Sequence, residues 1–535
     1  MEPEKADGNV EYKLKLINKD EDRIESLASQ MRFRCDEGNS ECIYKIGLQD
    51  DGTEVGITEF EFGQTIKILN SMAKKNNYSV NLLYRKAINN KFIYTVLVRE
   101  INDEKYLNVN VSIAGSVDAG KSSFVGVLTS GNADDGRGLA RLSVFNFEHE
   151  IRSGRTSSVG QHIVGFDLNG KIINYKSSLG KNGWLDIVKK SKKIISFFDL
   201  AGHEKYLKTT ILGLSCSFPD LCLIMVAANR GVLKMTKEHI FLCIALKIPF
   251  VIVITKIDMV KNYENVMKET TDSINIIAKS PIVNRIPLKI KDESDCIIAA
   301  EKIHTESIIP IFSLSNVTRE GFNNFELFLN LLAPKKKVEN TNVEFHIESI
   351  WNVNGIGLVV GGNLISGKIS VNDNLYVGPI GNKYVQTGIK SIHCKRVPVQ
   401  EIESGCYVTL ALKKIDRNDL RKGNVLVSTI EQGNCCFEFK ANIKVLRSHS
   451  TTIKIGYEPI VHVFGVRQTA TLVKIENKTN ARNGTLNDDV LRTGDAAEAW
   501  FKFCYHAEFM KTGSRLIFCE GSIKVIGVVT EIKNV

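Results

Sequence analysis

The cysteine patterns that mark zinc sites and disulfide frameworks are missing from this 535-residue sequence. Its twelve cysteines include no Cys-x-x-Cys pair, and the adjacent Cys435 and Cys436 suit neither a zinc knuckle nor an ordinary disulfide. The acidic, polar N-terminus also lacks the apolar run of a secretory signal. We therefore expect free thiols, a reducing compartment and a cytoplasmic location.

Long hydrophobic runs are scarce as well. The longest apolar stretch begins at Ile240 and is interrupted by Lys247 and Pro249, so it is too short to span a bilayer. It is more typical of a helix end followed by a buried strand. We therefore expect a soluble protein that has no membrane partner. We also expect a monomer.

The excess of positive over negative charge is also small for the length of the chain. The formal net charge of +10 is spread over a long chain, which indicates nucleic-acid binding less clearly than one strongly basic domain would. It is compatible with a ribosome or RNA partner. The Pro-Lys-Lys-Lys run at residues 334–337 is more typical of a solvated linker than of an RNA contact.

The chain is too long for one hydrophobic core, so we expect several domains. The pattern of apolar, polar and turn-forming residues changes along it accordingly. Residues 1–27 are charged and low in apolar content, which predicts a flexible tail. Residues 28–105 predict a small α/β region, with two strands around an Asn-Asn-Lys turn. In residues 106–336, apolar strand-like runs alternate with helical runs, which predicts a mostly parallel sheet covered by helices on both faces.

The C-terminal part has short strands separated by Gly and Asn turns, which is typical of β-barrels. Its length suffices for two barrels, which we place at residues 337–432 and 433–535. The predicted fold class is therefore a multidomain chain: a small α/β segment, an α/β P-loop domain and two β-barrels.

A glycine-rich loop follows the first strand of the predicted parallel sheet. Gly115 to Ser122 match G-x-x-x-x-G-K-[ST], in which backbone N–H groups surround a phosphate at a helix N-terminus. Lys121 would reach the β- and γ-phosphates, and the Ser122 hydroxyl would bind Mg2+. The alternative is an ordinary glycine turn that begins a helix. The expected loop contacts are Gly115, Ser116, Val117, Asp118, Ala119, Gly120, Lys121, Ser122 and Ser123.

Three further motifs follow in order, each at the end of an apolar strand, where this fold class binds ligands. Asp199 can hold Mg2+ through water, and the Gly202 N–H can contact the γ-phosphate. Asp258 can accept from guanine N1–H and N2–H2, a donor pair that adenine lacks, which predicts GTP. Backbone N–H groups of residues 315–317 can meet guanine O6. The expected contacts are Asp199, Leu200, Ala201, Gly202, His203, Thr255, Lys256, Ile257, Asp258, Ser315, Asn316 and Val317.

His203 directly follows Gly202, so it lies beside the γ-phosphate if the loop is built in this way. A loop histidine taken alone would more simply face solvent. Next to the Asp-x-x-Gly sequence it predicts a catalytic group.

Taken together, these motifs resemble those of the translation-factor GTPases, which include elongation factor Tu. The sequence is most similar to the GTP-binding protein one/two branch of that superfamily. The resemblance extends from about Cys42 to the C-terminus. It is carried by the strings VDAGKS, GRTSSVG, DLAGHEKYLKTTILGL, MTKEH, TKIDM, LSNVT, KSIHCKRVPV and VRQTATL.

The resemblance implies hydrolysis of GTP to GDP, linked to a conformational switch that usually works on the ribosome. RNA-associated machinery and tRNA are the implied partners. Thr156 would be the switch threonine, a Mg2+ ligand with Ser122 and Asp199. His203 would position the attacking water, and Asp118 can hold a monovalent cation such as K+. The implied catalytic residues are His203, Lys121 and Thr156.

The sequence departs from elongation factor Tu at several positions of these motifs. Ser116 and Ala119 replace histidines, and Thr255 replaces the asparagine of Asn-Lys-x-Asp while keeping one hydrogen bond. Arg155 replaces an isoleucine thought to gate the catalytic histidine, so we do not assume the same activation path. The basic segment 165–193, which contains Trp184, has no role that the sequence defines.

Two alternative functions stay open. A GTP-dependent binding adaptor in RNA decay or ribosome rescue, with negligible turnover, is compatible with the charged residue at the gate. An ATPase would follow if the aspartate of Thr-Lys-Ile-Asp does not contact a guanine.

Overall fold

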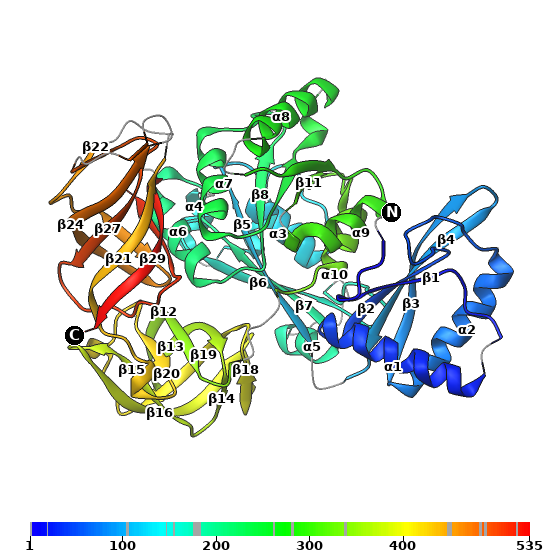
Figure 1. Cartoon of the computed structure of the whole chain (residues 1–535), viewed down its shortest axis with the longest axis horizontal. Coiled ribbons are helices and arrows are strands. Elements are labelled where there is room, and N and C mark those ends of the chain that lie inside the picture. The colour runs from blue at the N-terminus through cyan, green and yellow to red at the C-terminus, as the bar shows by residue number, and fades with distance from the viewer. Residues whose placement is uncertain are drawn as a thin grey trace.

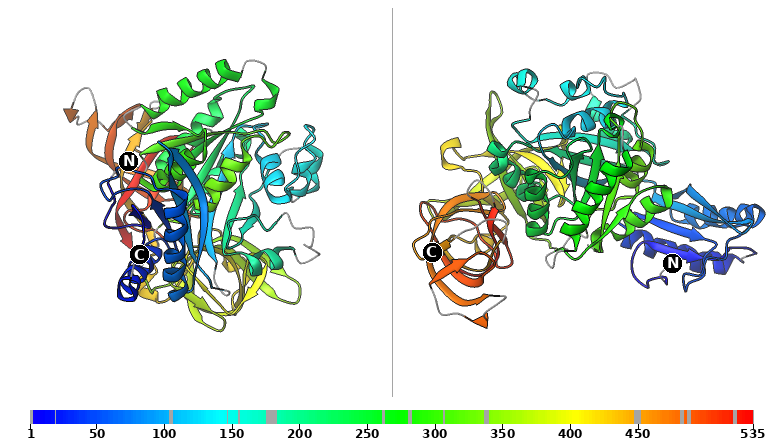
Figure 2. Two further views of the ribbon diagram at one scale, coloured as in Figure 1. Left: turned by 90° about the vertical axis from the view of Figure 1, so that its right-hand side faces the viewer. Right: turned by 90° about the horizontal axis from the view of Figure 1, so that it is seen from above.

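The computed structural model places a small α/β layer, a central α/β domain and two β-barrels side by side (Figure 1). The right-hand view of Figure 2 shows the N-terminal layer and the second barrel on opposite sides of the central domain. The structure describes residues 3–18, 20–102, 106–145, 147–153, 156–174, 183–260, 263–279, 283–305, 307–335, 340–446, 452–480, 484–485, 489–519 and 523–534.

The N-terminal layer is a four-stranded sheet in the order β1-β2-β4-β3, covered by two helices. A capping box between Thr58 and Glu61 begins its second helix, and the turn between β3 and β4 contains Asn89 and Asn90 in left-handed conformations. The predicted small α/β segment is therefore confirmed. Its elements are β1 (Val10–Lys13), α1 (Glu21–Glu37), β2 (Glu41–Ile46), α2 (Glu59–Lys75), β3 (Tyr78–Ile88) and β4 (Lys91–Glu100).

The prediction of a flexible tail at residues 1–27 is wrong. β1 joins the sheet next to β2, and Asp20 caps the N-terminus of α1 by accepting from the Arg23 N–H at 2.9 Å. The Glu11 carboxylate is buried, and it accepts from Arg34 Nε at 2.6 Å. The Glu11 charge is thus paired inside the layer, which composition cannot reveal, although most other charges of this segment are exposed.

The central domain has a seven-stranded sheet in the order β10-β11-β9-β8-β5-β7-β6. Neighbouring strands are parallel except β6, which runs antiparallel to β7 at one edge. The mostly parallel sheet is therefore confirmed, while β6 and the short β10 are additions to the predicted strands. The strands are β5 (Leu107–Gly115), β6 (Gly160–Phe166), β7 (Lys193–Asp199), β8 (Leu221–Ala227), β9 (Phe250–Thr255), β10 (Ile286–Lys289) and β11 (Ile308–Ser313).

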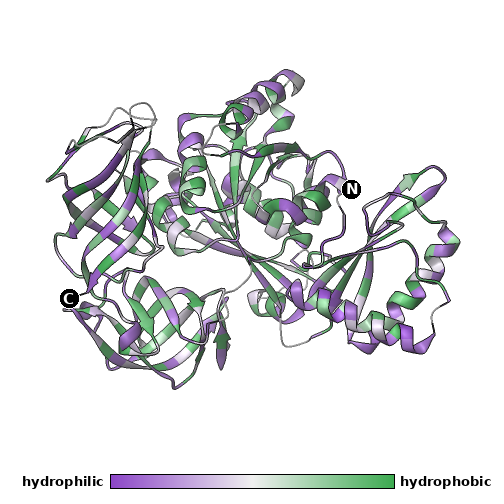
Figure 3. Ribbon diagram, in the orientation of Figure 1, coloured by the Kyte–Doolittle hydropathy of each residue, from purple (hydrophilic) through white to green (hydrophobic). Residues whose placement is uncertain are grey.

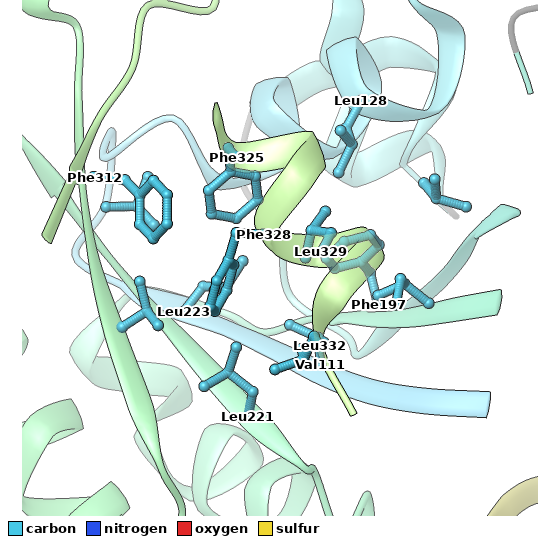
Figure 4. Packing of buried hydrophobic residues seen from close by; sticks show 14 of the residues in the cluster. Val111, Leu128, Phe197, Leu221, Leu223, Phe312, Phe325, Phe328, Leu329 and Leu332 are labelled. Atoms are coloured by element: carbon cyan, nitrogen blue, oxygen red, sulfur yellow. The ribbon is translucent and has the colours of Figure 1, made fainter. Parts of the chain in front are cut away.

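Helices cover both faces of this sheet. One core cluster contains residues of α3, α9 and α10, and Figure 4 shows Phe325, Phe328 and Leu329 packed against strand residues that include Leu221 and Phe312. The other cluster contains residues of α6, α7 and α8. The helices are α3 (Lys121–Ser130), α4 (Glu148–Ser153), α5 (Gly183–Lys190), α6 (Leu207–Cys216), α7 (Lys234–Leu246), α8 (Tyr263–Ala278), α9 (Glu293–Lys302) and α10 (Phe322–Leu331).

Two closed barrels follow, as predicted. In the first, a β15–β16 pairing closes the ring β15-β20-β12-β13-β19-β16, and in the second a β23–β24 pairing closes β23-β28-β29-β21-β27-β24. Apolar and polar residues alternate along many of these strands (Figure 3), which fills each barrel with side chains.

The strands of the first barrel region are β12 (Glu344–Val353), β13 (Gly357–Ser366), β14 (Lys368–Ser370), β15 (Asn374–Ile380), β16 (Lys383–Cys394), β17 (Val397–Val399), β18 (Glu401–Glu403), β19 (Cys406–Lys413) and β20 (Val425–Val427). Those of the second are β21 (Cys436–Val445), β22 (Thr452–Lys454), β23 (Ile460–Val463), β24 (Val466–Asn480), β25 (Gly484–Thr485), β26 (Val490–Arg492), β27 (Ala496–Phe503), β28 (Arg515–Cys519) and β29 (Ile523–Asn534).

Within the described ranges, none of the helices combines the length and apolar character that a bilayer crossing needs. The cysteines whose side chains the structure describes carry free thiols.

A buried ionic cluster joins the N-terminal layer to the central domain. Lys193, at the start of β7, bonds the Glu41 carboxylate and the Asn330 carbonyl, and Arg99 reaches Glu41 at 2.7 Å. Burial lowers the pKa of Lys193 to about 8. Burial also opposes ionisation of Glu41, but the Lys193 and Arg99 charges outweigh it and hold the pKa of Glu41 below its ordinary value. The three charged groups thus depend on one another.

Replacing Glu41 with glutamine should destabilise this junction. The change leaves two buried cations without their carboxylate, and breaking one partner of a buried ion pair costs about 3–5 kcal/mol. Thermal unfolding and limited proteolysis of the N-terminal layer measure the effect. The control is Glu59→Gln, which breaks an exposed pair with Arg85 and should cost under about 1 kcal/mol. Equal shifts in the two variants would show that the cluster does not hold the layer in place.

Candidate nucleotide-binding site

The glycine-rich loop connects the end of β5 to the start of α3. Gly115 has φ +150°, and a Cβ there would lie 2.5 Å from the Met225 carbonyl oxygen, so only glycine fits. Gly120, with φ +77°, turns the chain into α3. The Lys121 side chain folds back over the loop and donates to the carbonyl oxygens of Gly115 at 3.1 Å and Ser116 at 2.9 Å. The loop is thus a closed cradle with an ammonium group at its centre.

Three side-chain oxygens from separate segments converge beside this cradle. Ser122 Oγ donates to Asp199 Oδ2 at 2.6 Å and lies 2.9 Å from Thr156 Oγ1, which donates to the same carboxylate oxygen at 3.4 Å. Asp199 ends β7, and Thr156 belongs to the segment between α4 and β6. The predicted metal-binding group of Ser122, Thr156 and Asp199 is therefore brought together in space.

The chemistry of this oxygen group fits Mg2+. The second carboxylate oxygen of Asp199, Oδ1, is buried and has no hydrogen-bond partner in the described part of the chain. Burial raises the pKa of Asp199, although the Lys121 ammonium and the Ser122 hydroxyl act in the opposite direction. No cluster of three His, Cys, Asp or Glu side chains occurs among the described residues. A cation here would thus take hydroxyl and carboxylate oxygens, with water and phosphates completing its shell.

A cavity opens above the cradle. The Gly202 backbone closes one side so tightly that a Cβ there would lie 2.3 Å from Lys121 Nζ. The lining contains nine predicted site residues and one, Arg141, that the sequence analysis missed. The lining residues are Val117, Asp118, Gly120, Lys121, Ser122, Ser123, Arg141, Thr156, Gly202 and His203.

His203 lies between Gly202 and a short 3-10 helix, η2 (Glu204–Tyr206). Its Nδ1 accepts from the Lys205 N–H at 3.1 Å. In a neutral ring the proton is therefore on Nε2, which leaves Nε2 as a donor. In this tautomer Nε2 can donate a hydrogen bond to a water oxygen, but it cannot accept a proton from that water.

The loops predicted to bind the base are hydrogen-bonded to the phosphate loop. Thr255, at the end of β9, donates from Oγ1 to the Ala119 carbonyl at 2.9 Å, and Asn316 Nδ2 donates to the Gly120 carbonyl at 3.3 Å. The threonine in place of asparagine thus keeps a bond to the loop. These residues lie beside the cradle but not in the lining of the cavity.

Asp258 is exposed on a 3-10 turn, η3 (Ile257–Met259), next to the loop that follows β11. Its Oδ1 accepts from Ser315 Oγ at 2.6 Å, which orients the carboxylate. The structure therefore places Asp258 beside residues 315–317, as the guanine prediction requires.

Some predicted site residues have other surroundings. Leu200, Ala201 and Ile257 are buried, so only their backbone can face a ligand. The Asp118 carboxylate lies 3.5 Å from Arg230 Nη2, so a positive charge is already beside it and a monovalent cation there stays a prediction. Arg155 lies outside the described residues.

Trp184, from the segment without a defined role, lies between domains. Its ring, on α5, lies 4.3 Å from the guanidinium carbon of Arg396 in the first barrel region, a cation–π geometry. Residues 175–182 of that segment are outside the described ranges. The contact joins two residues that are far apart in the sequence, so the sequence pattern could not predict it.

A strand, glycine loop and helix beside a group of hard oxygens, followed by two barrels, define a P-loop nucleotide-binding protein. Two family models match the chain: the Elongation factor Tu GTP binding domain over residues 107–344 and the Elongation factor Tu domain 2 over residues 357–427.

Curated relatives match nearly the whole chain. GTP-binding protein 1 of Xenopus laevis is 41% identical over 532 residues, which cover 98% of this chain and 79% of the relative. GTP-binding protein 2 of Homo sapiens is 39% identical over 549 residues, with 100% and 88% covered. The chain therefore belongs to the GTP-binding protein 1 and 2 family, and the resemblance inferred from the motifs is confirmed.

More distant proteins are similar in sequence or in structure. Elongation factor 1-alpha of Archaeoglobus fulgidus is 26% identical over 398 residues, which cover 73% of this chain and 88% of that protein. The structure of translation elongation factor SelB from Methanococcus maripaludis with the GTP analogue GppNHp has a TM-score of 0.56 at 20% identity, covering 81% of this chain and 80% of that one. The predicted fold class is thus confirmed.

Replacing Asp258 with asparagine should change base selectivity. The amide would present N–H groups to the N1–H and N2–H2 donors of guanine, whereas xanthine offers an oxygen acceptor at position 2. We expect GTP affinity to fall at least about 30-fold and XTP affinity to rise, because an unmatched polar contact replaces a charge-assisted one. Competition against a fluorescent nucleotide measures both. An unchanged GTP affinity would contradict guanine recognition by Asp258.

Proposed function

We propose that this protein is a Mg2+-dependent GTPase that hydrolyses GTP to GDP as a conformational switch. The observation that carries the proposal is the convergence of Ser122, Asp199 and Thr156 beside the phosphate cradle. Thr156 comes from a segment far from the cradle in sequence, so its hydroxyl is available only while that segment is folded against the site. A bound γ-phosphate with its cation would favour this arrangement.

The residues of the cavity can divide the chemistry among them. Lys121 and the loop N–H groups stabilise charge on the phosphates, and the Gly202 N–H contacts the terminal one. His203 Nε2 donates to the attacking water and holds it in line, because Nδ1 is occupied by the Lys205 N–H. Ser122, Thr156 and Asp199 would hold Mg2+, which when bound supplies further positive charge to the phosphate oxygens.

A continuous segment links this site to both barrels. It begins at Gly202 in the cavity wall, passes through η2 and α6, and ends where Asn363 of the first barrel donates to the Cys216 carbonyl. α7 on the same face contacts the second barrel, where Arg515 donates to the Ala245 carbonyl at 3.0 Å. Release of the terminal phosphate would therefore relax a segment that is packed against the barrels.

The relatives suggest the process in which the switch acts. Elongation factor 1-alpha and SelB are named as elongation factors; the first is similar to this chain in sequence and the second in fold. We therefore place the protein in translation or RNA turnover, with the ribosome, an RNA-associated assembly or a tRNA as its partner.

Replacing His203 with alanine should keep GTP binding and lower stimulated hydrolysis about 100-fold or more, because the water loses the donor that orients it. Fluorescent-nucleotide titration and single-turnover hydrolysis separate the two effects. The matched control is His506→Ala, an exposed histidine of the second barrel region that should leave both unchanged. Undiminished hydrolysis in the His203 variant would remove this residue from the reaction.

Ribosomes should accelerate hydrolysis by the wild-type protein, because His203 Nε2 donates to the attacking water and cannot take a proton from it. Phosphate release measured with and without ribosomes checks this expectation. If GTP binds tightly but neither condition gives turnover, the protein is instead a GTP-dependent binding adaptor.

A further inference from the structure

The segment between α3 and η1 (Ala140–Ser143) crosses the base end of the nucleotide site. Gly131 ends α3, and its carbonyl accepts from Arg319 Nη1. The Asp134 N–H then donates to the Asn316 carbonyl at 2.8 Å. The segment is thus fixed to the loop that carries residues 315–317.

The same segment then turns back onto α3. Asp135 Oδ1 accepts from two backbone N–H groups, those of Arg137 at 2.8 Å and Leu139 at 3.1 Å. Asp134 Oδ1 accepts from the Ala140 N–H at 2.9 Å. η1 packs so closely on α3 that a Cβ at Gly126 would lie 2.1 Å from the Ala140 carbonyl oxygen. The position of Arg141 is therefore fixed by local hydrogen bonds and by a close helix contact.

From this position the Arg141 side chain reaches the cavity above the phosphate cradle. It passes close to Gly138, where a Cβ would lie 2.6 Å from its Nε. It lines the cavity together with Lys121, Thr156 and His203. Lys121 Nζ donates to two loop carbonyls at the base of this cavity. Arg141 is therefore the second positively charged side chain in the cavity lining.

We propose that Arg141 supplies positive charge in cis to the γ-phosphoryl group of bound GTP. The inference rests on the proposed function and names a further residue of that site. A guanidinium offers paired N–H donors that match phosphate oxygens, and its charge does not depend on pH in the ordinary range. Arg141 lines the same cavity as Thr156 and His203. Because the proposed reaction places Thr156 and His203 beside the γ-phosphate, Arg141 contacts that phosphate as well.

The reaction that this charge assists is simple hydrolysis. The water oxygen forms a bond to the γ-phosphorus, and the bond from that phosphorus to the β,γ-bridging oxygen breaks, leaving its electron pair on GDP. Both hydrogens of the water stay with the inorganic phosphate, one on the attacking oxygen and one transferred to a γ-oxygen. Negative charge develops on the bridging oxygen and spreads over the γ-oxygens in the transition state. A fixed cation beside those oxygens stabilises the transition state more than the ground state.

The test uses full-length Arg141→Ala and Arg141→Lys proteins, with Arg137→Ala as the control. Arg137 is an exposed arginine of the same segment and does not line the cavity. Thermal unfolding verifies that all three variants are folded. Affinities for fluorescent GDP and for a non-hydrolysable GTP analogue are measured by titration, and hydrolysis is measured in single-turnover assays.

For Arg141→Ala we expect GDP affinity within about threefold of wild type, a GTP-analogue to GDP affinity ratio lowered about tenfold, and hydrolysis lowered about 100-fold or more. Arg141→Lys should restore part of the affinity ratio and less of the rate, since an ammonium lacks the paired donors. Arg137→Ala should match wild type throughout.

Equal losses of GDP and analogue affinity, or an unchanged ratio and rate, would overturn the proposal, since Arg141 would then contact the inner phosphates or only pack against the chain. If wild-type protein shows no turnover even with ribosomes, the proposed GTPase function fails. The affinity ratio still decides whether Arg141 contacts the terminal phosphate.

Discussion

The buried carboxylate of Asp199 constrains the rest of the nucleotide site. A fully buried acid stays ionised only if cations and hydrogen-bond donors surround it, and here Lys121 and Ser122 at the start of α3 and Thr156 before β6 do so. Both of these segments must therefore keep their positions against the end of β7. The sheet order, which puts β5 beside β7, makes this meeting possible.

Hydrogen bonds also join the two ends of the site. Thr255 and Asn316 bond carbonyls of the phosphate loop, and Asp134 bonds Asn316 from the segment that leads to Arg141. A nucleotide would thus contact one connected frame, so that a change at the base end would be felt at the phosphates. Thr255, at the end of β9, makes this connection because its hydroxyl reaches the Ala119 carbonyl.

Motifs at the ends of buried strands made much of this architecture predictable. Hydrophobic runs defined five strands of the central sheet, and the glycine loop, Asp199 and Asp258 each followed one of them. The edge strand β6 was missed because its pairing partner, rather than its composition, makes it a strand. The same limit applies to Glu11, whose charge is neutralised by Arg34, and to Arg141, which only close packing of η1 on α3 directs into the cavity.

The strand β7 has a charged group at each end. Asp199 belongs to the nucleotide site, whereas Lys193 depends on Glu41 and Arg99 of the N-terminal layer for its counter-charge and surroundings. Ile43 of β2 even belongs to the core of the central domain. The smallest autonomous folding unit with an intact nucleotide site therefore begins well before the glycine-rich loop. A recombinant fragment cut where the parallel sheet starts would expose an ammonium group that the intact chain buries, six residues from Asp199.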